Sequence, residues 1–107
     1  MRYSLLVFAA ALVAASAANA AAPTLSELMD KCRGNAQSCQ ADIGDYITSA
    51  SQNHLICMPK DTSHDRAISD MLDWLRQANS EKPAMANGSA DDAEWDAVNA
   101  LWPCHKD

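Results

Sequence analysis

Four cysteines constrain this chain more than any other feature of its sequence. They are Cys32, Cys39, Cys57 and Cys104, and all of them follow an apolar N-terminal run. An even number of cysteines in a short exported chain predicts a disulfide framework, because a domain of this size buries little apolar surface. No C-x-x-C pair occurs in the sequence. We therefore expect disulfides at these positions and no metal site.

The first twenty residues have the features of a secretory signal peptide. Arg2 precedes the apolar run LLVFAAALVAA, and the sequence ANA at positions 18–20 is an A-x-A cleavage site. The apolar run is too short for a membrane-spanning helix. We expect export, removal of residues 1–20, and a single helical domain over residues 21–107 that has no membrane attachment.

The charge of the chain is strongly negative. The net charge is −6 for the full sequence and −7 without Arg2, which is the one charged residue among residues 1–20. A surface of this sign repels phosphate backbones and anionic lipids, so nucleic-acid and membrane binding are disfavoured. It suits a protein whose partner presents a basic groove.

Apolar residues recur at the spacing of amphipathic helices after residue 24. We expect four helices, at about residues 25–32, 40–53, 63–78 and 90–101. In the third of these, an apolar stripe is formed by Ile68, Met71, Leu72 and Leu75. No run of strand length alternates between apolar and polar residues. The predicted fold is all-α, a small four-helix bundle stapled by two disulfides.

Capping residues mark the expected helix starts. Thr24 and Glu27 form a capping box before the first helix, and Ser89 is the predicted N-cap of the fourth. For the third helix the pattern favours Thr62 as the N-cap, with Asp65 three residues later. Polar loops are expected at residues 33–38 and 79–88, each of which contains a glycine.

Gly44, inside the second helix, has two interpretations. It weakens the helix by about 1 kcal/mol relative to alanine. Such a glycine marks either the close packing of a neighbouring helix or simple tolerance.

The order of the helices indicates which cysteines pair. Short loops make neighbouring helices antiparallel, so Cys32 and Cys39 lie at one end of the bundle. Cys57 and Cys104 each follow a helix that ends at the opposite end. Pairing of Cys39 with Cys57 is disfavoured, because the helix between them holds its ends about 20 Å apart. We predict the bridges Cys32–Cys39 and Cys57–Cys104.

The sequence contains no motif of a catalytic or cofactor-binding site. It lacks GxSxG, HExxH and a P-loop, and no histidine among His54, His64 and His105 stands beside a cysteine that is free to act as a nucleophile. The carboxylates are expected to be scattered over exposed faces. We expect a binding protein and not an enzyme, without a cofactor or a metal.

These elements, in this order, resemble the Rap/Tai family of immunity proteins, which protect bacteria from type VI-secreted peptidoglycan amidases. The resemblance rests on Cys39 followed by Tyr46-Ile47, on the sequence CMP at positions 57–59 and on LWPC at positions 101–104. It covers nearly all of the chain after the signal peptide, although the tyrosine lies further from Cys39 than is usual in the family. The resemblance implies a periplasmic protein that binds a cognate amidase, occludes its active-site cleft and often forms a homodimer.

Residues 79–88 and the exposed edge of the third helix are our hypothesis for the docking surface. Its predicted contacts are Asp73, Arg76, Glu81 and Lys82; the alternative is that residues 79–88 are only a connector. Two other functions are considered. An HdeA-like acid-activated periplasmic chaperone would suit a chain with fourteen acidic residues, although such chaperones typically have one bridge. A binding domain of the same fold with an unrelated partner is the second.

Overall fold

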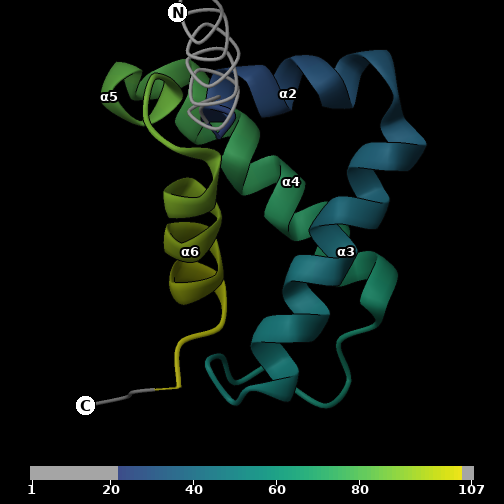
Figure 1. Ribbon diagram of the computed structural model, residues 1–107. Coiled ribbons are helices and arrows are strands. Elements are labelled where there is room, and N and C mark those ends of the chain that lie inside the picture. Colours follow the sequence, from purple (N-terminus) through teal and green to yellow (C-terminus); the bar gives the residue numbers. More distant parts are fainter. Residues whose placement is uncertain (1–21, 105–107) are drawn as a thin grey trace, which may run out of the picture.

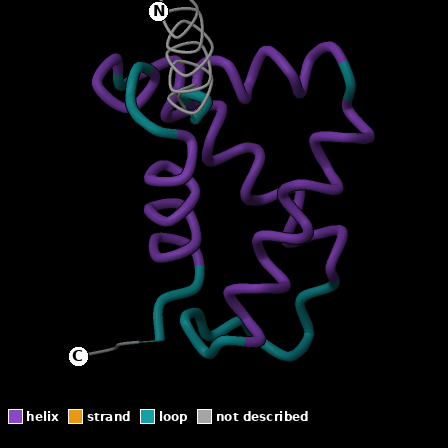
Figure 2. The backbone as a smooth tube through the Cα atoms, in the orientation of Figure 1, coloured by secondary structure: helices purple, strands orange, loops and turns teal. Residues whose placement is uncertain are grey.

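The computed structural model describes residues 22–104, and these residues form four long helices and one short helix without a strand (Figures 1 and 2). The all-α prediction is therefore confirmed. The predicted signal peptide and His105 lie outside the described residues. The helices are α2 (Leu25–Gly34), α3 (Ala36–Gln52), α4 (His64–Glu81), α5 (Pro83–Ala86) and α6 (Ala90–Leu101).

The polar loop predicted at residues 33–38 is reduced to one residue between α2 and α3. Asn35 caps α3, because its Oδ1 accepts a hydrogen bond of 3.0 Å from the Ser38 backbone N–H. The side chain of an asparagine can supply the acceptor that the first turn of a helix needs. α3 therefore begins at Ala36, earlier than the predicted start near residue 40.

The N-cap of α4 is Ser63 and not the predicted Thr62. Ser63 Oγ accepts a hydrogen bond of 3.1 Å from the Arg66 backbone N–H. Serine and threonine are both good N-caps. Two adjacent candidates therefore leave the start of a helix uncertain by one residue until the backbone is known.

The predicted loop at residues 79–88 is mostly helical, so this prediction is wrong. α4 continues to Glu81, and Pro83 then opens the short helix α5. Proline suits the first turn of a helix, because its missing N–H would have no partner there and its φ is already helical. The same residue that ends one helix starts the next.

α4 is the central helix of the fold. It packs against each of the four other described helices, and in Figure 1 it runs obliquely between α6 on one side and α3 on the other. Ile68, at the edge of its predicted apolar stripe, is only partly buried. The buried residues of α4 are Ala67, Met71, Leu72, Leu75 and Ala78.

Gly44 lies where α3 passes the start of α4. A Cβ atom at this position would lie 2.9 Å from His64 Nε2 and 3.2 Å from Ile68 Cδ1. Both distances are shorter than ordinary contacts between carbon and another heavy atom. Of the two interpretations of Gly44, close packing of a neighbouring helix is confirmed.

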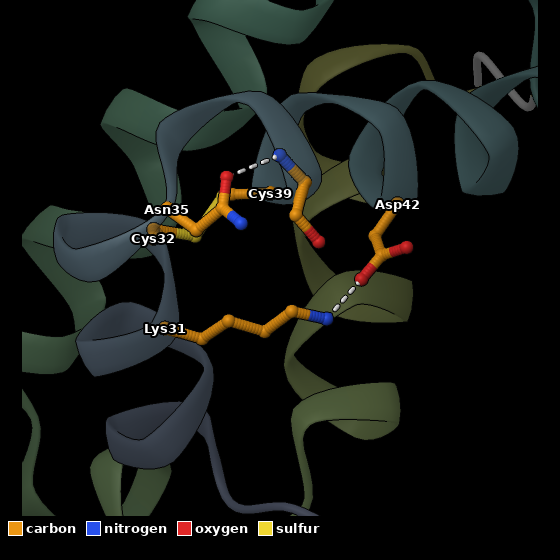
Figure 3. Close-up of a disulfide and its surroundings, with 6 residues drawn as sticks. Lys31, Cys32, Asn35, Cys39 and Asp42 are labelled. Carbon is orange, nitrogen blue, oxygen red and sulfur yellow. Dashed lines mark hydrogen bonds and ion pairs between the residues drawn. A yellow bond between two sulfur atoms is a disulfide. The ribbon is translucent and has the colours of Figure 1, made fainter.

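Both predicted disulfides are confirmed. The Cys32–Cys39 bridge has a Cα–Cα distance of 4.9 Å and closes the turn between α2 and α3 (Figure 3). The Cys57–Cys104 bridge has a Cα–Cα distance of 4.7 Å and links the loop after α3 to the residues that follow α6. In the loop-entropy model the smaller ring contributes about 2.5 kcal/mol to stability and the larger about 4 kcal/mol.

A backbone clip ties the start of the described chain to the start of α6. Thr24 and Ser89 form an isolated antiparallel bridge, and the Leu25 backbone N–H donates a hydrogen bond of 3.0 Å to Gly88 O. Ser89 is also the N-cap of α6, as predicted, since its Oγ accepts from the Asp92 backbone N–H at 3.3 Å. The clip and the larger disulfide hold α6 at both of its ends.

Candidate functional site

The four predicted contact residues are all exposed and extend from Asp73, in the middle of α4, to Lys82, just after its C-terminal end. We call them the α4-end surface. Asp73 and Arg76 form an ion pair of 3.3 Å with side chains that are 72% and 60% exposed. An exposed pair of this kind contributes less than about 1 kcal/mol. Both side chains can therefore leave this ion pair and contact a partner instead at little cost in free energy. The set is Asp73, Arg76, Glu81 and Lys82.

The structure brings Glu81 and Lys82 together around a shallow hollow of about 180 Å³ that Trp74 also lines. Glu81 Oε2 accepts a hydrogen bond of 3.3 Å from Gln77 Nε2. Arg76 instead borders two other hollows, one of them beside the Cys32–Cys39 bridge. The half-buried Trp74 was not among the predicted contacts, although its position beside the apolar stripe of α4 was a visible signal.

A larger hollow, of about 470 Å³, lies between α2, α3 and α6. We call it the Glu94 groove. α3 and α6 make little direct contact with each other, whereas each packs on α2 and α4, so space remains between them. The residues that line the groove are Pro23, Glu27, Leu28, Lys31, Asp42, Asp45, Tyr46, Ala90, Asp91 and Glu94.

Helical spacing explains why these side chains share one groove. Residues three or four apart lie on the same face of a helix. α3 contributes Asp42, Asp45 and Tyr46 at this spacing, and α6 contributes Asp91 and Glu94. The groove is therefore bordered by two acidic helix faces that the packing on α2 and α4 places opposite each other.

Glu94 is the only charged side chain that is buried among the described residues, with 7% of its surface exposed. None of the ion pairs in this part of the chain includes it, and the charged group that acts on it most strongly is another carboxyl, that of Asp91. Burial, together with the nearby charges of Asp91 and Asp42, raises the pKa of Glu94 from 4.5 to about 7. The prediction that the carboxylates are scattered over exposed faces is thus wrong for Glu94.

Two neighbours of Glu94 in the groove, Tyr46 and Lys31, are affected by the same carboxylates. Burial raises the pKa of Tyr46, and the carboxylates of Glu94 and Asp91 add to this effect. Lys31, the one basic residue that lines the groove, extends from α2 to the carboxylate of Asp42 on α3 (Figure 3). Its ammonium group is therefore already paired, and it is not paired with Glu94.

The sequence did contain a signal for Glu94. It lies four residues after Ala90 and three before Ala97, so a glutamate occupies the apolar stripe of the fourth helix. A buried carboxylate is costly unless it is paired, and such positions are frequently functional. The groove itself could not be predicted from the sequence, because it depends on how three helices pack.

The described residues set limits on other kinds of site. Among residues 22–104, no cluster of three or more histidine, cysteine, aspartate or glutamate side chains is placed to hold a metal ion. None of the helices in the described part of the chain is long and apolar enough to cross a membrane. All four cysteines are bridged, which indicates folding in an oxidising compartment. No protein-family model, curated protein or solved structure matches this chain.

Proposed function

We propose that this is a periplasmic immunity protein of the Rap/Tai type. It binds a type VI-secreted peptidoglycan amidase and inhibits it by occluding the active-site cleft. The observation that carries the proposal is the Cys57–Cys104 bridge, which joins the CMP sequence at positions 57–59 to the LWPC sequence at positions 101–104. These are the two most specific elements of the resemblance, and their pairing gives them a common structural role.

The architecture suits a stoichiometric inhibitor. A domain held by two disulfides and a backbone clip is preorganised, so it loses little conformational entropy when it docks. The α4-end surface presents charged side chains on a regular helix and at its C-cap, and the negative net charge of the chain speeds its association with a basic cleft. Glu81 and Lys82, beside the hollow that Trp74 lines, form the centre of the proposed contact.

Calorimetry on the oxidised protein purified after export, with candidate cysteine–histidine amidases, tests the proposal. We expect nanomolar binding that abolishes peptidoglycan hydrolysis. Alanine substitutions at Asp73, Arg76, Glu81 and Lys82 then map the surface, and at least one is expected to weaken binding about tenfold. Lys60→Ala is the matched control, because Lys60 is also an exposed lysine but precedes α4, at its opposite end.

Unchanged affinity in all four variants would move the contact away from the α4-end surface. Failure to bind any amidase, together with suppression of aggregation at about pH 3, would instead favour the acid-activated chaperone. Glu94 argues against that alternative, because acidification removes a charge that its buried position disfavours. Analytical ultracentrifugation of the same preparation tests the homodimer that the resemblance implies.

A further inference from the structure

Glu94 occupies a position that the fold alone would fill with an apolar residue. Its neighbours on the buried face of α6 include Ala90, Ala97 and Val98. Burial of a carboxylate costs free energy unless a cation or several donors compensate for it. Within the described residues Glu94 has no cationic partner, and it lines the groove. The side chain is thus buried, uncompensated and adjacent to an open space.

The groups around Glu94 make the groove strongly negative. Five carboxylates and one ammonium line it, which leaves a formal charge of −4 when all are ionised. The ammonium, on Lys31, is held by Asp42. The charged and titratable groups are Glu27 and Lys31 from α2, Asp42, Asp45 and Tyr46 from α3, and Asp91 and Glu94 from α6.

The rest of the lining suits an elongated cation. Leu28, Ala90 and Pro23 supply apolar surface beside the carboxylates, and the methylene stems of lysine and arginine cover such surface while their charged ends reach polar groups. The groove, at about 470 Å³, is much larger than a single ion. Tyr46 adds an aromatic ring, a group that attracts organic cations.

We propose that the Glu94 groove binds an alkyl ammonium or guanidinium group, and that its occupant is a lysine or arginine side chain of a partner protein. The negative net charge of the whole chain selects a basic partner for the same reason. The side chain lays its stem over Leu28 and Ala90 and places its charged end between Glu94 and Asp91. This site is separate from the α4-end surface and does not depend on the proposed immunity function.

The test is an NMR titration of the oxidised, exported protein with small model compounds. The probes are the N-acetyl methylamides of lysine and arginine, with that of norleucine as an uncharged control of similar shape. We expect the two cationic probes to shift the resonances of Glu94, Asp91 and Tyr46 and to saturate with a Kd of about 1 mM. Glu94→Gln, which keeps the shape of the side chain, is expected to weaken binding at least about tenfold.

Asp61→Asn is the control for charge alone. It removes one negative charge from the exposed loop between α3 and α4, outside the groove. If Asp61→Asn weakens binding as much as Glu94→Gln does, or if norleucine shifts the same resonances equally, the groove is not a cation site. Tighter binding of spermidine than of the lysine probe would assign the groove to free polyamines and overturn the protein occupant. Displacement of the probes by Ca²⁺ would overturn both.

The outcome is independent of the amidase experiment. A groove that binds no cation leaves the α4-end surface and its amidase unaffected. Conversely, a protein that binds no amidase can still saturate with the lysine probe. Each proposal therefore fails by its own measurement.

Discussion

Replacing Glu94 with glutamine is expected to stabilise the protein in a manner that depends on pH. The pKa of Glu94 is about 7 in the folded protein against an ordinary value of 4.5. Between these two values the unfolded chain gives up the proton while the folded protein keeps it, so rising pH favours unfolding. Below pH 4.5 the carboxyl is neutral in both states and the substitution changes little. Above pH 7 the full cost of the buried charge is present.

The size of the effect follows from the two pKa values. At 1.36 kcal/mol per pH unit, the difference between 4.5 and about 7 corresponds to about 3 kcal/mol. Water reaches the open side of the groove and reduces the free-energy penalty of the buried charge. We therefore expect Glu94→Gln to raise the free energy of unfolding by about 1–3 kcal/mol at high pH. In a domain of this size, 1 kcal/mol corresponds to a change in Tm of about 4–8 °C.

Urea unfolding of both proteins, with the disulfides intact, measures this gain. Curves recorded at several pH values from about 4 to 8 are expected to coincide at the acidic end and to separate steadily as the pH rises. Asp61→Asn removes an exposed charge and is expected to stay within about 0.5 kcal/mol of the original protein throughout. Because both variants are compared with the same protein at each pH, titration of the other carboxylates cancels.

Two results would refute the reasoning. A gain of the same size at both ends of the pH range would mean that glutamine packs better and that the charge of Glu94 is irrelevant. A loss of stability at high pH would mean that a cation in the folded protein stabilises the carboxylate, so that its pKa is lowered and not raised. Direct titration of the Glu94 carboxyl by NMR distinguishes these two cases.

Three further predictions concern the architecture. Replacing both Cys57 and Cys104 by serine is expected to lower the free energy of unfolding by about 4 kcal/mol, against about 2.5 kcal/mol for the smaller bridge, as measured by urea unfolding; equal losses would contradict the dependence on ring size. Replacing glycine by alanine inside a helix normally raises the free energy of unfolding by roughly 1 kcal/mol. Gly44→Ala is expected to raise it by less, because the new Cβ meets His64 at 2.9 Å. Part of the gain should return in the background of His64→Ala, because the close approach to Ile68 at 3.2 Å remains, and thermal melts of the four proteins decide this. Ser63→Ala is expected to cost about 1 kcal/mol through loss of the N-cap, whereas alanine at the preceding threonine should cost little.

The pairing of the disulfides could be predicted because it depends on chain topology more than on detail. The order of the helices and the length of α3 are enough to separate the ends at which the cysteines lie. The capping box at Thr24 and the N-cap at Ser89 are local signals, and both are present in the structure. The start of α4 was ambiguous because two adjacent residues could each accept the same kind of hydrogen bond.

The predictions that were wrong concerned features that depend on residues far apart in the sequence. Pro83 breaks one helix and begins another, and only the continuation of the chain decides which role it takes. The Glu94 groove needs α3 and α6 to pack on common neighbours with little contact between themselves. Periodicity places Glu94 on the apolar face of its helix, but it does not reveal that two other helices, α2 and α3, bring carboxylates to the same groove.

The clip between Thr24 and Ser89 has a consequence for the order of events as the chain is made. It joins residues 65 positions apart, and the larger disulfide cannot close until Cys104 is available. Contacts between distant residues slow folding, because the chain between them must first be brought together. A chain that stops before α6 leaves the inner face of α4 uncovered, so the native fold cannot be completed from the N-terminus onward. Such a chain lacks both the clip and the larger disulfide, so we expect it to be less stable than the complete domain.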